Sequence, residues 1–283
     1  MNYNIILKTF GLCVIIYLPF RLKEKIINFE EKISVIIPTF NRAKSIIQSI
    51  NSILSQTYHN LEVLIIDDCS NDNTESLISK MEDRRIKYIK LEENKGANFA
   101  RNLGIKLSTG KYITFQDSDD IYHIDKIEKQ YLNMIKRKSD FDFCQFCLHF
   151  NNSFEVIFPR KYQQKNIQRK KILEELCNGN FITTQSMLIK NSFIKKNLYI
   201  NKVFDTNFSR FQDYDLVLRL IPNCKVSYTK KVLVDLYRNE DSIGKNYTKL
   251  NQSFHLLSLK KYNINCKKDS FLLSPFSSLS KYE

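Results

Sequence analysis

Apolar residues recur at two alternating spacings along the chain from Ile33 onward. The run ISVII, residues 33–37, is short and rich in β-branched side chains, which predicts a buried strand. In the next segment the apolar side chains recur every three or four residues, as on one face of a helix: Ile46, Ile47, Ile50, Ile53 and Leu54. The chain therefore begins its regular part with a strand followed by a helix.

The same alternation repeats three more times. Strands are predicted over 61–67, 85–91 and 111–117, and helices over 72–81 and 96–108. Asp72 or Asn73 is suited to the N-cap of the first of these helices, and Gly110 follows the second as a stop signal. Strands separated by helices predict a parallel sheet with right-handed crossovers, buried on both faces, in an α/β fold.

The second half is less regular. We predict a helix over 124–138, strands near 141–150 and 181–190, a helix over 212–221, a strand near 225–237 and a weak helix over 248–262. The regular pattern fades after about residue 245. We expect one αβα unit with four parts: an apolar and basic N-terminal segment (1–32), a ligand-binding half (33–120), a second half that shapes another site (121–245), and a tail (246–283).

The N-terminal segment is a candidate for membrane association. Ile5 to Phe20 is apolar apart from Lys8, Thr9 and Gly11, and the basic run RLKEK follows it. The stretch is short for a bilayer span, which needs roughly 20 residues, and no small-residue cleavage site follows it. Two interpretations stay open: a short membrane-associating helix, or a helix that packs on the rest of the protein.

Charge and cysteine content narrow the classes of partner and compartment. The net charge is +14, and ten of the basic residues lie between Phe158 and Lys202. Such a segment suits an anionic membrane surface, unless it is only a solvated face; nucleic acid is not expected, since no nucleic-acid motif accompanies it. Seven scattered cysteines indicate a reducing compartment. Cys144 and Cys147 point to opposite faces of a predicted strand, so we expect core thiols there, and the four histidines are not expected to bind metal.

Polar clusters follow all four of the first strands. They are PTFNR (38–42), DDCSNDN (67–73), ENKG (93–96) and DSDD (117–120). Ligands of parallel sheets bind beyond the carboxyl ends of the strands, so these clusters should converge on one crevice. A lone acidic cluster is often a solvated turn. Directly after a buried strand, however, Asp117 and Asp119 offer the hard oxygen ligands that Mg²⁺ or Mn²⁺ prefers.

Five ordered motifs give the chain a resemblance to a known family. SVIIPTFNR (34–42), IIDDCSNDNT (65–74), NKGANFARNLGI (94–105), QDSDD (116–120) and QDYDLVLRL (212–220) resemble the family 2 glycosyltransferases of the GT-A fold, over about residues 33–240. The resemblance implies a Rossmann-like αβα sandwich with a mostly parallel central sheet. It also implies an inverting, non-processive enzyme with a nucleotide-sugar donor.

The resemblance assigns roles to individual residues. Asp213 would be the catalytic base, and Asp119 with Asp117 would bind the metal, Mn²⁺ or Mg²⁺. The residues implied for donor binding are Pro38, Thr39, Asn41, Arg42, Asp68, Asn98, Arg101, Asp117 and Arg238. Asp68 would accept a hydrogen bond from the nucleotide base, uracil or another. Arg238 would help to neutralise the leaving diphosphate.

This sequence departs from the family pattern at three places. Gln212 precedes Asp213 where the family often has a second acid, so the base would lack an acidic neighbour that raises its pKa. Cys69 replaces the usual glycine after the paired aspartates, which we interpret as a packing substitution. Asn239 and Glu240 stand where a histidine is frequent, which leaves a third metal contact in doubt.

Together these observations predict a hexosyl- or N-acetylhexosaminyltransferase. It would move one sugar from a nucleotide-diphosphate donor, with UDP-sugar expected, to a hydroxyl of a cell-surface glycan precursor such as lipopolysaccharide or capsule. A glycan or lipid-linked glycan acceptor would be met at the cytoplasmic face of the inner membrane, where the protein would be peripheral or anchored. The alternatives are a nucleotidyltransferase, although PTFNR lacks a phosphate-binding glycine, and a catalytically inactive nucleotide-binding scaffold.

Overall fold

The computed structural model describes residues 5–9, 12–16, 31–150, 154–159, 169–177, 180–198 and 202–238. The chain divides into two compact units, residues 1–30 and residues 31–283. In the first unit, strands β1 (Ile5–Thr9) and β2 (Leu12–Ile16) pair antiparallel, with Ile5 opposite Ile16. The predicted helix is therefore wrong for these residues, because the β-branched isoleucines and Val14 suit a strand.

The remainder of the N-terminal segment, 17–30, lies outside the described residues, as do the predicted helix over 248–262 and the tail. Within the part of the chain that is described, none of the helices combines the length and the apolar character needed to cross a bilayer. Membrane association stays a proposal.

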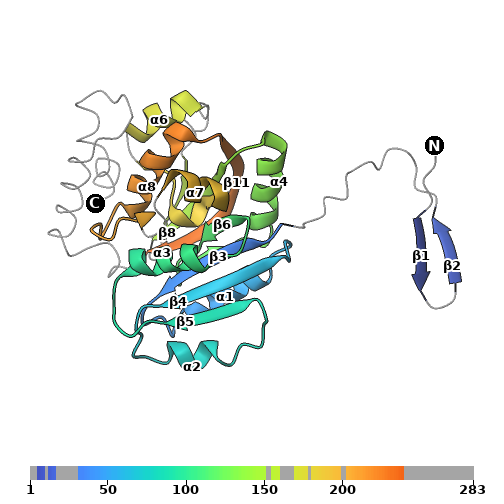
Figure 1. Cartoon of the computed structure of the whole chain (residues 1–283), viewed down its shortest axis with the longest axis horizontal. Coiled ribbons are helices and arrows are strands. Elements are labelled where there is room, and N and C mark those ends of the chain that lie inside the picture. The colour runs from blue at the N-terminus through green and yellow to red at the C-terminus, as the bar shows by residue number, and fades with distance from the viewer. Residues whose placement is uncertain are drawn as a thin grey trace. The chain divides into compact units, whose positions relative to one another are not determined.

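The second unit is built on one mixed sheet, seen in Figure 1, with strand order β5-β4-β3-β6-β10-β8-β11-β7 and β9 paired to β8. Its strands are β3 (Ile33–Thr39), β4 (Leu61–Asp67), β5 (Ile86–Lys90), β6 (Tyr112–Phe115), β7 (Ile121–Tyr122), β8 (Phe141–Phe150), β9 (Phe154–Phe158), β10 (Met187–Lys190) and β11 (Val226–Arg238). Its helices are α1 (Ile46–Leu54), α2 (Thr74–Ile78), α3 (Ala97–Leu107), α4 (Lys126–Arg137), α6 (Arg169–Cys177), α7 (Asn191–Asn197) and α8 (Gln212–Leu220).

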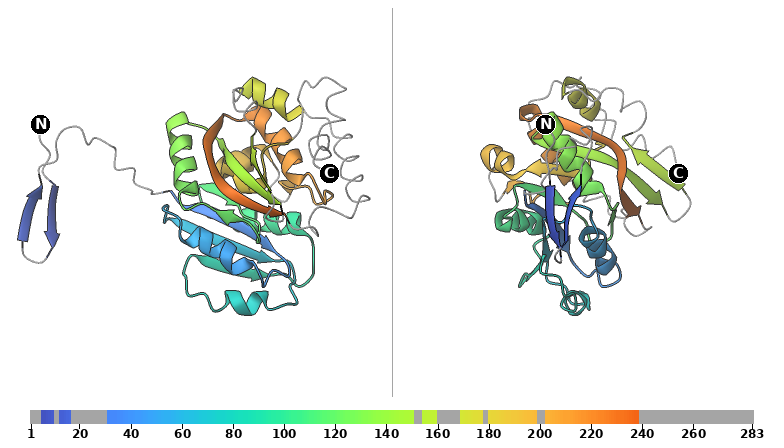
Figure 2. Two further views of the ribbon diagram at one scale, coloured as in Figure 1. Left: turned by 180° about the vertical axis from the view of Figure 1, so that it is seen from behind. Right: turned by 90° about the vertical axis from the view of Figure 1, so that its right-hand side faces the viewer.

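The first half of the sheet confirms the prediction from hydrophobic spacing. Strands β5, β4, β3 and β6 are parallel, and every residue of β3, β4 and β6 is buried. Helices α1 and α3 cover opposite faces of this half (Figures 1 and 2). Gly104 lets α3 approach β3 closely, since a Cβ built at Gly104 would lie 2.4 Å from Ile36 Cγ2. Burial on both faces explains the continuous apolar runs of β3, β4 and β6. The edge strand β5 is only partly buried, so the predicted burial on both faces is wrong there.

The second half of the sheet changes direction. Strand β10 pairs antiparallel with both β6 and β8, and β11 runs parallel to β8 and antiparallel to the two-residue strand β7. The strand predicted over 181–190 is confirmed only at its end, because residues 184–186 form the 3-10 helix η1 (Thr184–Ser186). A second 3-10 helix, η3 (Ile221–Asn223), follows α8. Aromatic side chains fill the core beneath this half, including Phe115, Phe143 and Phe204.

Candidate active site

Asp117 is held between two elements that come from different halves of the chain. Its Oδ1 accepts a hydrogen bond from Arg101 Nη2 of α3 at 2.8 Å, and its Oδ2 accepts one from Gln185 Nε2 of η1 at 2.7 Å. Arg101 is buried, and the Asp117 side chain is 29% exposed. A buried guanidinium thus neutralises one of the three clustered aspartates.

Asp120 is fully buried, and it joins the loop after β6 to β11. Its Oδ2 accepts from Gln185 Nε2 at 2.7 Å, and its Oδ1 accepts from the backbone N–H of Tyr237 at 3.1 Å. The amide of Gln185 therefore donates to two carboxylates at once. Asp120 fixes the position of the loop and is placed in the interior rather than toward a ligand.

Asp119 is the most exposed of the three aspartates, at 37% of its side chain, and its Oδ2 lies 3.5 Å from Arg42 Nη2. With Asp117 it provides carboxylate oxygens on one loop, and a carboxylate keeps acceptor capacity after one hydrogen bond to each oxygen. All-oxygen donors of this kind fit Mg²⁺ or Mn²⁺. Asp119 and Asp117 are therefore the residues that would hold such an ion.

Asp213 lies in the first turn of α8, two residues after Phe211, whose backbone is left-handed at φ 61°. Burial raises the pKa of the Asp213 carboxyl to about 6. A hydrogen bond from the N–H of Tyr214 and the charge of Arg101 oppose this rise, while the charge of Asp117 adds to it. The acidic neighbour that the sequence lacks at Gln212 is thus supplied in space by Asp117.

Asn98 and Asn102 of α3 position the loop that leads to α8. Asn98 Nδ2 donates to the carbonyl oxygens of Asp205 and Phe208 at 3.1 and 2.6 Å, and its Oδ1 accepts from Arg101. Asn102 Nδ2 donates to the carbonyl oxygen of Phe204 at 2.7 Å. Asn98, expected to bind the donor, has its amide group engaged with protein atoms in this structure.

The residues of the loop after β3 lie beside the end of β4. Pro38 is buried in β3 beyond the last residue that pairs with β6, so its missing N–H leaves no gap in that ladder. Asn41 is left-handed at φ 52°, and its N–H donates to Ser70 Oγ while its Oδ1 accepts from Asn71 N. The N–H of Arg42 donates to Thr74 Oγ1.

Several buried polar atoms have no hydrogen-bond partner among the described residues, and two of them belong to residues expected to bind the donor. These two are Thr39 Oγ1, at the end of β3, and Arg101 Nε. A buried donor or acceptor without a partner costs about 1–3 kcal/mol, which a bound ligand can recover.

Asp68 is buried and organises the turn before α3. Its Oδ1 and Oδ2 accept hydrogen bonds at 2.7 Å from the backbone N–H groups of Lys95 and Gly96, respectively. Gly96 is left-handed at φ 86°. The assignment of Asp68 to the nucleotide base stays a prediction, and any such contact would use the acceptor capacity that these two bonds leave.

Cys69 corrects one interpretation of the sequence. Its backbone is left-handed at φ 69°, and its thiol is only partly buried, 3.4 Å from the carbonyl oxygen of Glu92. Glycine is common at such a position because it adopts positive φ without steric cost. Cys69 therefore adopts a backbone conformation that glycine reaches more easily. Its partly exposed thiol does not fill a gap in the core, so packing does not account for the substitution.

Arg238 is the last residue of β11, and its side chain lies outside the described residues, as do Asn239 and Glu240. The sequence reasoning also missed two residues of the site, Gln185 and Tyr237. Gln185 sits in a 3-10 helix with no motif of its own, and Tyr237 contributes a backbone N–H. Nothing in the residue pattern marks either one.

Solved structures with the same fold are known. Staphylococcus aureus TarS (residues 1–349) in complex with UDP-GlcNAc matches with a TM-score of 0.67 and 20% identity, covering 84% of this chain and 68% of that one. The Pyrobaculum calidifontis mannosyltransferase PcManGT in complex with GDP-Man and Mn²⁺ matches with a TM-score of 0.60 and 17% identity, covering 82% and 66%. The GT-A fold expected from the sequence is confirmed.

Curated relatives are similar over part of their length. The Escherichia coli glucosyltransferase WfgD, named UDP-Glc:alpha-D-GlcNAc-diphosphoundecaprenol beta-1,3-glucosyltransferase, is 40% identical over 131 residues, which cover 46% of this chain and 52% of WfgD. An uncharacterized glycosyltransferase of Rickettsia felis is 40% identical over 153 residues, or 54% of this chain. The match spans about half of WfgD and only 22% of the Rickettsia protein.

The family model described as glycosyl transferase family 2 matches residues 34–198. This range contains the loops after β3, β4 and β6 and the helix that carries Arg101, so the match includes most of the site. Since it covers more than half of the sequence, the chain belongs to glycosyl transferase family 2.

Proposed function

We propose that this chain is an inverting, metal-dependent, non-processive glycosyltransferase that moves one hexose or N-acetylhexosamine from a UDP-sugar to a hydroxyl of a cell-surface glycan precursor. The observation that carries the proposal is the placement of Asp213. Burial raises the pKa of its carboxyl group, and the charges of Arg101 and Asp117 both act on it, although Asp213 belongs to the other half of the chain. One base beside a donor site is the arrangement that a single displacement needs.

The residues divide the chemistry between them. Asp213 would take the proton from the acceptor hydroxyl as that oxygen attacks the anomeric carbon, and a base is most effective when its pKa lies near the working pH. Arg42 and Arg101 supply positive charge around the loop after β6. When bound at Asp119 and Asp117, Mn²⁺ or Mg²⁺ would neutralise charge on the donor diphosphate as a Lewis acid.

The nature of the donor and the acceptor is inferred from similarity and charge. WfgD is named for UDP-Glc and a diphosphoundecaprenol-linked acceptor, and TarS was solved with UDP-GlcNAc. A lipid-linked acceptor would suit a protein on the cytoplasmic face of the inner membrane. The exposed Lys195, Lys196 and Lys202 belong to the basic segment 158–202 and are available to an anionic surface.

Calorimetric titration tests the donor site. The full chain is titrated with UDP, and with dTDP, GDP and CDP as controls, in the presence of Mn²⁺ and then of EDTA. We expect UDP binding that requires the metal and that weakens in Asp119→Ala. Equal UDP affinity with Mn²⁺ and with EDTA would reject the metal at this site, and no binding of any nucleotide would favour an inactive scaffold.

A further inference from the structure

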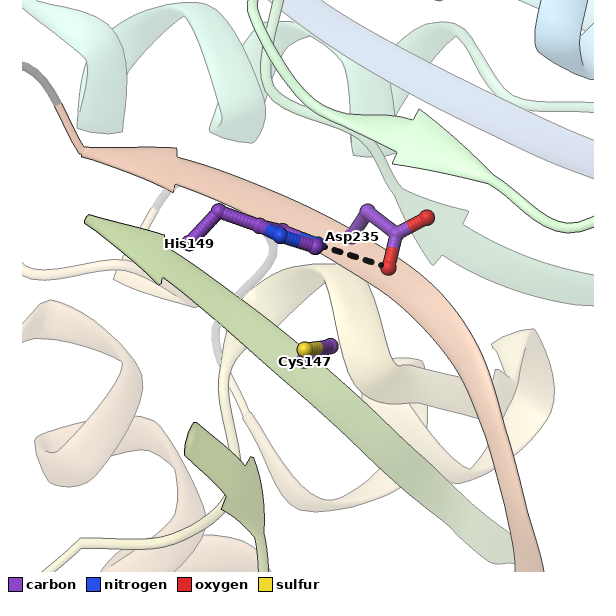
Figure 3. Close-up of side chains that lie close together, drawn as sticks. All are labelled: Cys147, His149 and Asp235. Atoms are coloured by element: carbon purple, nitrogen blue, oxygen red, sulfur yellow. Dashed lines mark hydrogen bonds and ion pairs between the residues drawn. The ribbon is translucent and has the colours of Figure 1, made fainter. Parts of the chain in front are cut away.

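A second cluster of potential metal ligands lies on β8 and β11, outside the loop after β6. In the parallel pairing of these strands Asp235 lies opposite Cys147, and Tyr237 lies opposite His149. Paired residues of neighbouring strands project from the same face of the sheet, and residues two apart on a strand share a face. The thiol, the imidazole and the carboxylate therefore lie together, as Figure 3 shows.

The distances within the cluster are short. Sγ of Cys147, a ring nitrogen of His149 and a carboxylate oxygen of Asp235 all lie within 4.8 Å of one another. His149 Nε2 is 3.0 Å from Asp235 Oδ1, the contact drawn dashed in Figure 3. Three ligand atoms at this spacing need only small side-chain shifts to surround one ion at the usual bond lengths of about 2.0–2.3 Å.

The carboxylate of Asp235 is oriented by a second histidine. His123, which follows β7, places its Nε2 2.9 Å from Asp235 Oδ2, the oxygen that does not contact His149. Metal ligands in proteins are commonly fixed by such outer partners. His149 is fixed as well, because its ring stacks on Tyr237 with a centroid distance of 4.9 Å. The cluster thus has both ligand atoms and supporting contacts.

The types of donor atom select the metal. A thiolate, an imidazole and a carboxylate suit Zn²⁺, whereas Mg²⁺ and Mn²⁺ prefer oxygen ligands alone. The donor set differs in this way from Asp117 and Asp119. The side chains of His149 and Asp235 are 20% and 22% exposed, so an ion can reach them from solvent.

We propose that Cys147, His149 and Asp235 bind Zn²⁺, with His123 as a positioning residue for Asp235. On binding, the Cys147 thiol releases its proton to solvent and becomes a thiolate. His149 coordinates through Nε2 as neutral imidazole with its proton on Nδ1, and the ion replaces the hydrogen bond between His149 and Asp235. No group is oxidised or reduced. Three protein ligands leave the fourth tetrahedral position to water.

The position of the cluster shows which parts of the fold the ion would connect. Asp235 pairs with Ile121 of β7, and the N–H of Tyr237, two residues later, donates to Asp120 Oδ1. An ion at this point ties β8 to β11 next to the loop that carries Asp117 and Asp119. The site does not depend on the proposed donor binding, and we expect Zn²⁺ to bind without any nucleotide.

Cobalt substitution tests the proposal. The full-length protein is treated with a chelator and titrated with Co²⁺, which reports a cysteine ligand by a thiolate-to-metal charge-transfer absorption that an all-oxygen site does not give. We expect this absorption to saturate at one equivalent and to disappear when Zn²⁺ is added. It should be lost in Cys147→Ser and retained in Cys144→Ser, a matched change on the same strand.

Two further variants separate this site from the donor site. His123→Ala should keep the absorption and lower Zn²⁺ affinity by about 10–100-fold, the usual effect of removing an outer partner of a ligand. Asp119→Ala should leave Zn²⁺ affinity unchanged. No charge-transfer absorption in the unmodified protein, or an absorption that persists in Cys147→Ser, would overturn the proposal. The first of these results needs no variant to fold, and it would identify the cluster as a hydrogen-bonded clamp without metal.

Discussion

Arg101 Nη2 lies 2.8 Å from Asp117 Oδ1, and both residues of this ion pair belong to the ligand-binding half of the chain, residues 33–120, which we propose binds the donor. Arg101 comes from α3, Asp117 from the loop after β6, and both charges act on Asp213 of α8. The protonation of the proposed base is therefore set by residues of the donor half. This coupling leads to predictions about the pH dependence of transfer.

Asp213→Asn should leave UDP affinity nearly unchanged and reduce sugar transfer by about 10²–10⁴-fold, the usual contribution of a general base. The amide keeps the shape of the side chain but accepts no proton. Calorimetry measures the first quantity and a transfer assay at saturating donor measures the second. Unchanged turnover would remove Asp213 from the mechanism.

In the unmodified protein, turnover should fall as the pH drops through about 6, since burial raises the Asp213 pKa to that value and the protonated form is no base. Arg101→Met removes a positive charge that lowers this pKa. The acidic limb of the pH profile of kcat should then move to higher pH. Arg42→Met is the matched control, and its limb should stay in place; a common shift in both variants would contradict the assignment.

Gln185→Ala should weaken Mn²⁺-dependent UDP binding and cost about 1–3 kcal/mol of stability, because Asp117 and Asp120 both lose a hydrogen-bond donor. Gln130→Ala offers a comparison, since the Gln130 amide is also buried and bonded to a carboxylate, that of Asp142. Chemical denaturation should show similar losses for the two variants, with reduced UDP affinity in Gln185→Ala alone.

Lys126→Met should raise the free energy of unfolding at pH 7 by on the order of 1–3 kcal/mol, because each unit by which burial lowers the Lys126 pKa corresponds to about 1.4 kcal/mol. Lys126 is fully buried, and burial lowers its pKa to about 8. Its charge therefore destabilises the fold below pH 8, and this cost fades as the pH rises toward the ordinary lysine pKa. Denaturation at pH 7 and pH 10 should show the gain shrinking; a loss of stability at pH 7 would mean that the contacts of Lys126 with Thr114 and the Tyr122 ring outweigh burial.

Removal of residues 1–22 should release the protein from membrane fractions without abolishing UDP binding, if the apolar segment is the anchor. Sedimentation of cell lysates compares the truncated and full-length chains, and calorimetry checks the donor site. Equal distribution of the two chains between membrane and supernatant would assign any membrane contact to the basic segment 158–202 instead.

The first half of the fold was predictable because three of its four strands, β3, β4 and β6, are buried on both faces. Continuous apolar runs such as Leu61–Asp67 leave little choice of structure, and that strand has the predicted bounds. The loops at the strand ends follow from the topology alone. Three residues of motifs that follow these strands lie in one region for this reason, although they are far apart in sequence: Arg101, Asp117 and Asp119. Asp213 comes to the same region from α8.

The rest depends on tertiary partners. Strand β7 has only two residues and is held by its pairing with β11. The N-terminal stretch is apolar at nearly every position, so its spacing does not distinguish a helix from the hairpin that it forms. The approach of Cys147 to Asp235 depends on the register of β8 against β11. The sequence analysis considered Cys147 only together with Cys144, which is three residues away. A neighbour on another strand leaves no mark in the local sequence pattern.

Asn98 and Asn102 contact only backbone atoms of the loop before α8, namely three carbonyl oxygens and the N–H of Phe204, while Phe204 and Phe208 anchor the loop in the core. The exposed position between these anchors, Thr206, is therefore under little constraint from the fold. The loop can change its surface side chains and still deliver Asp213 to the same place. The proposed position of the base is therefore independent of the side chains on the surface of this loop.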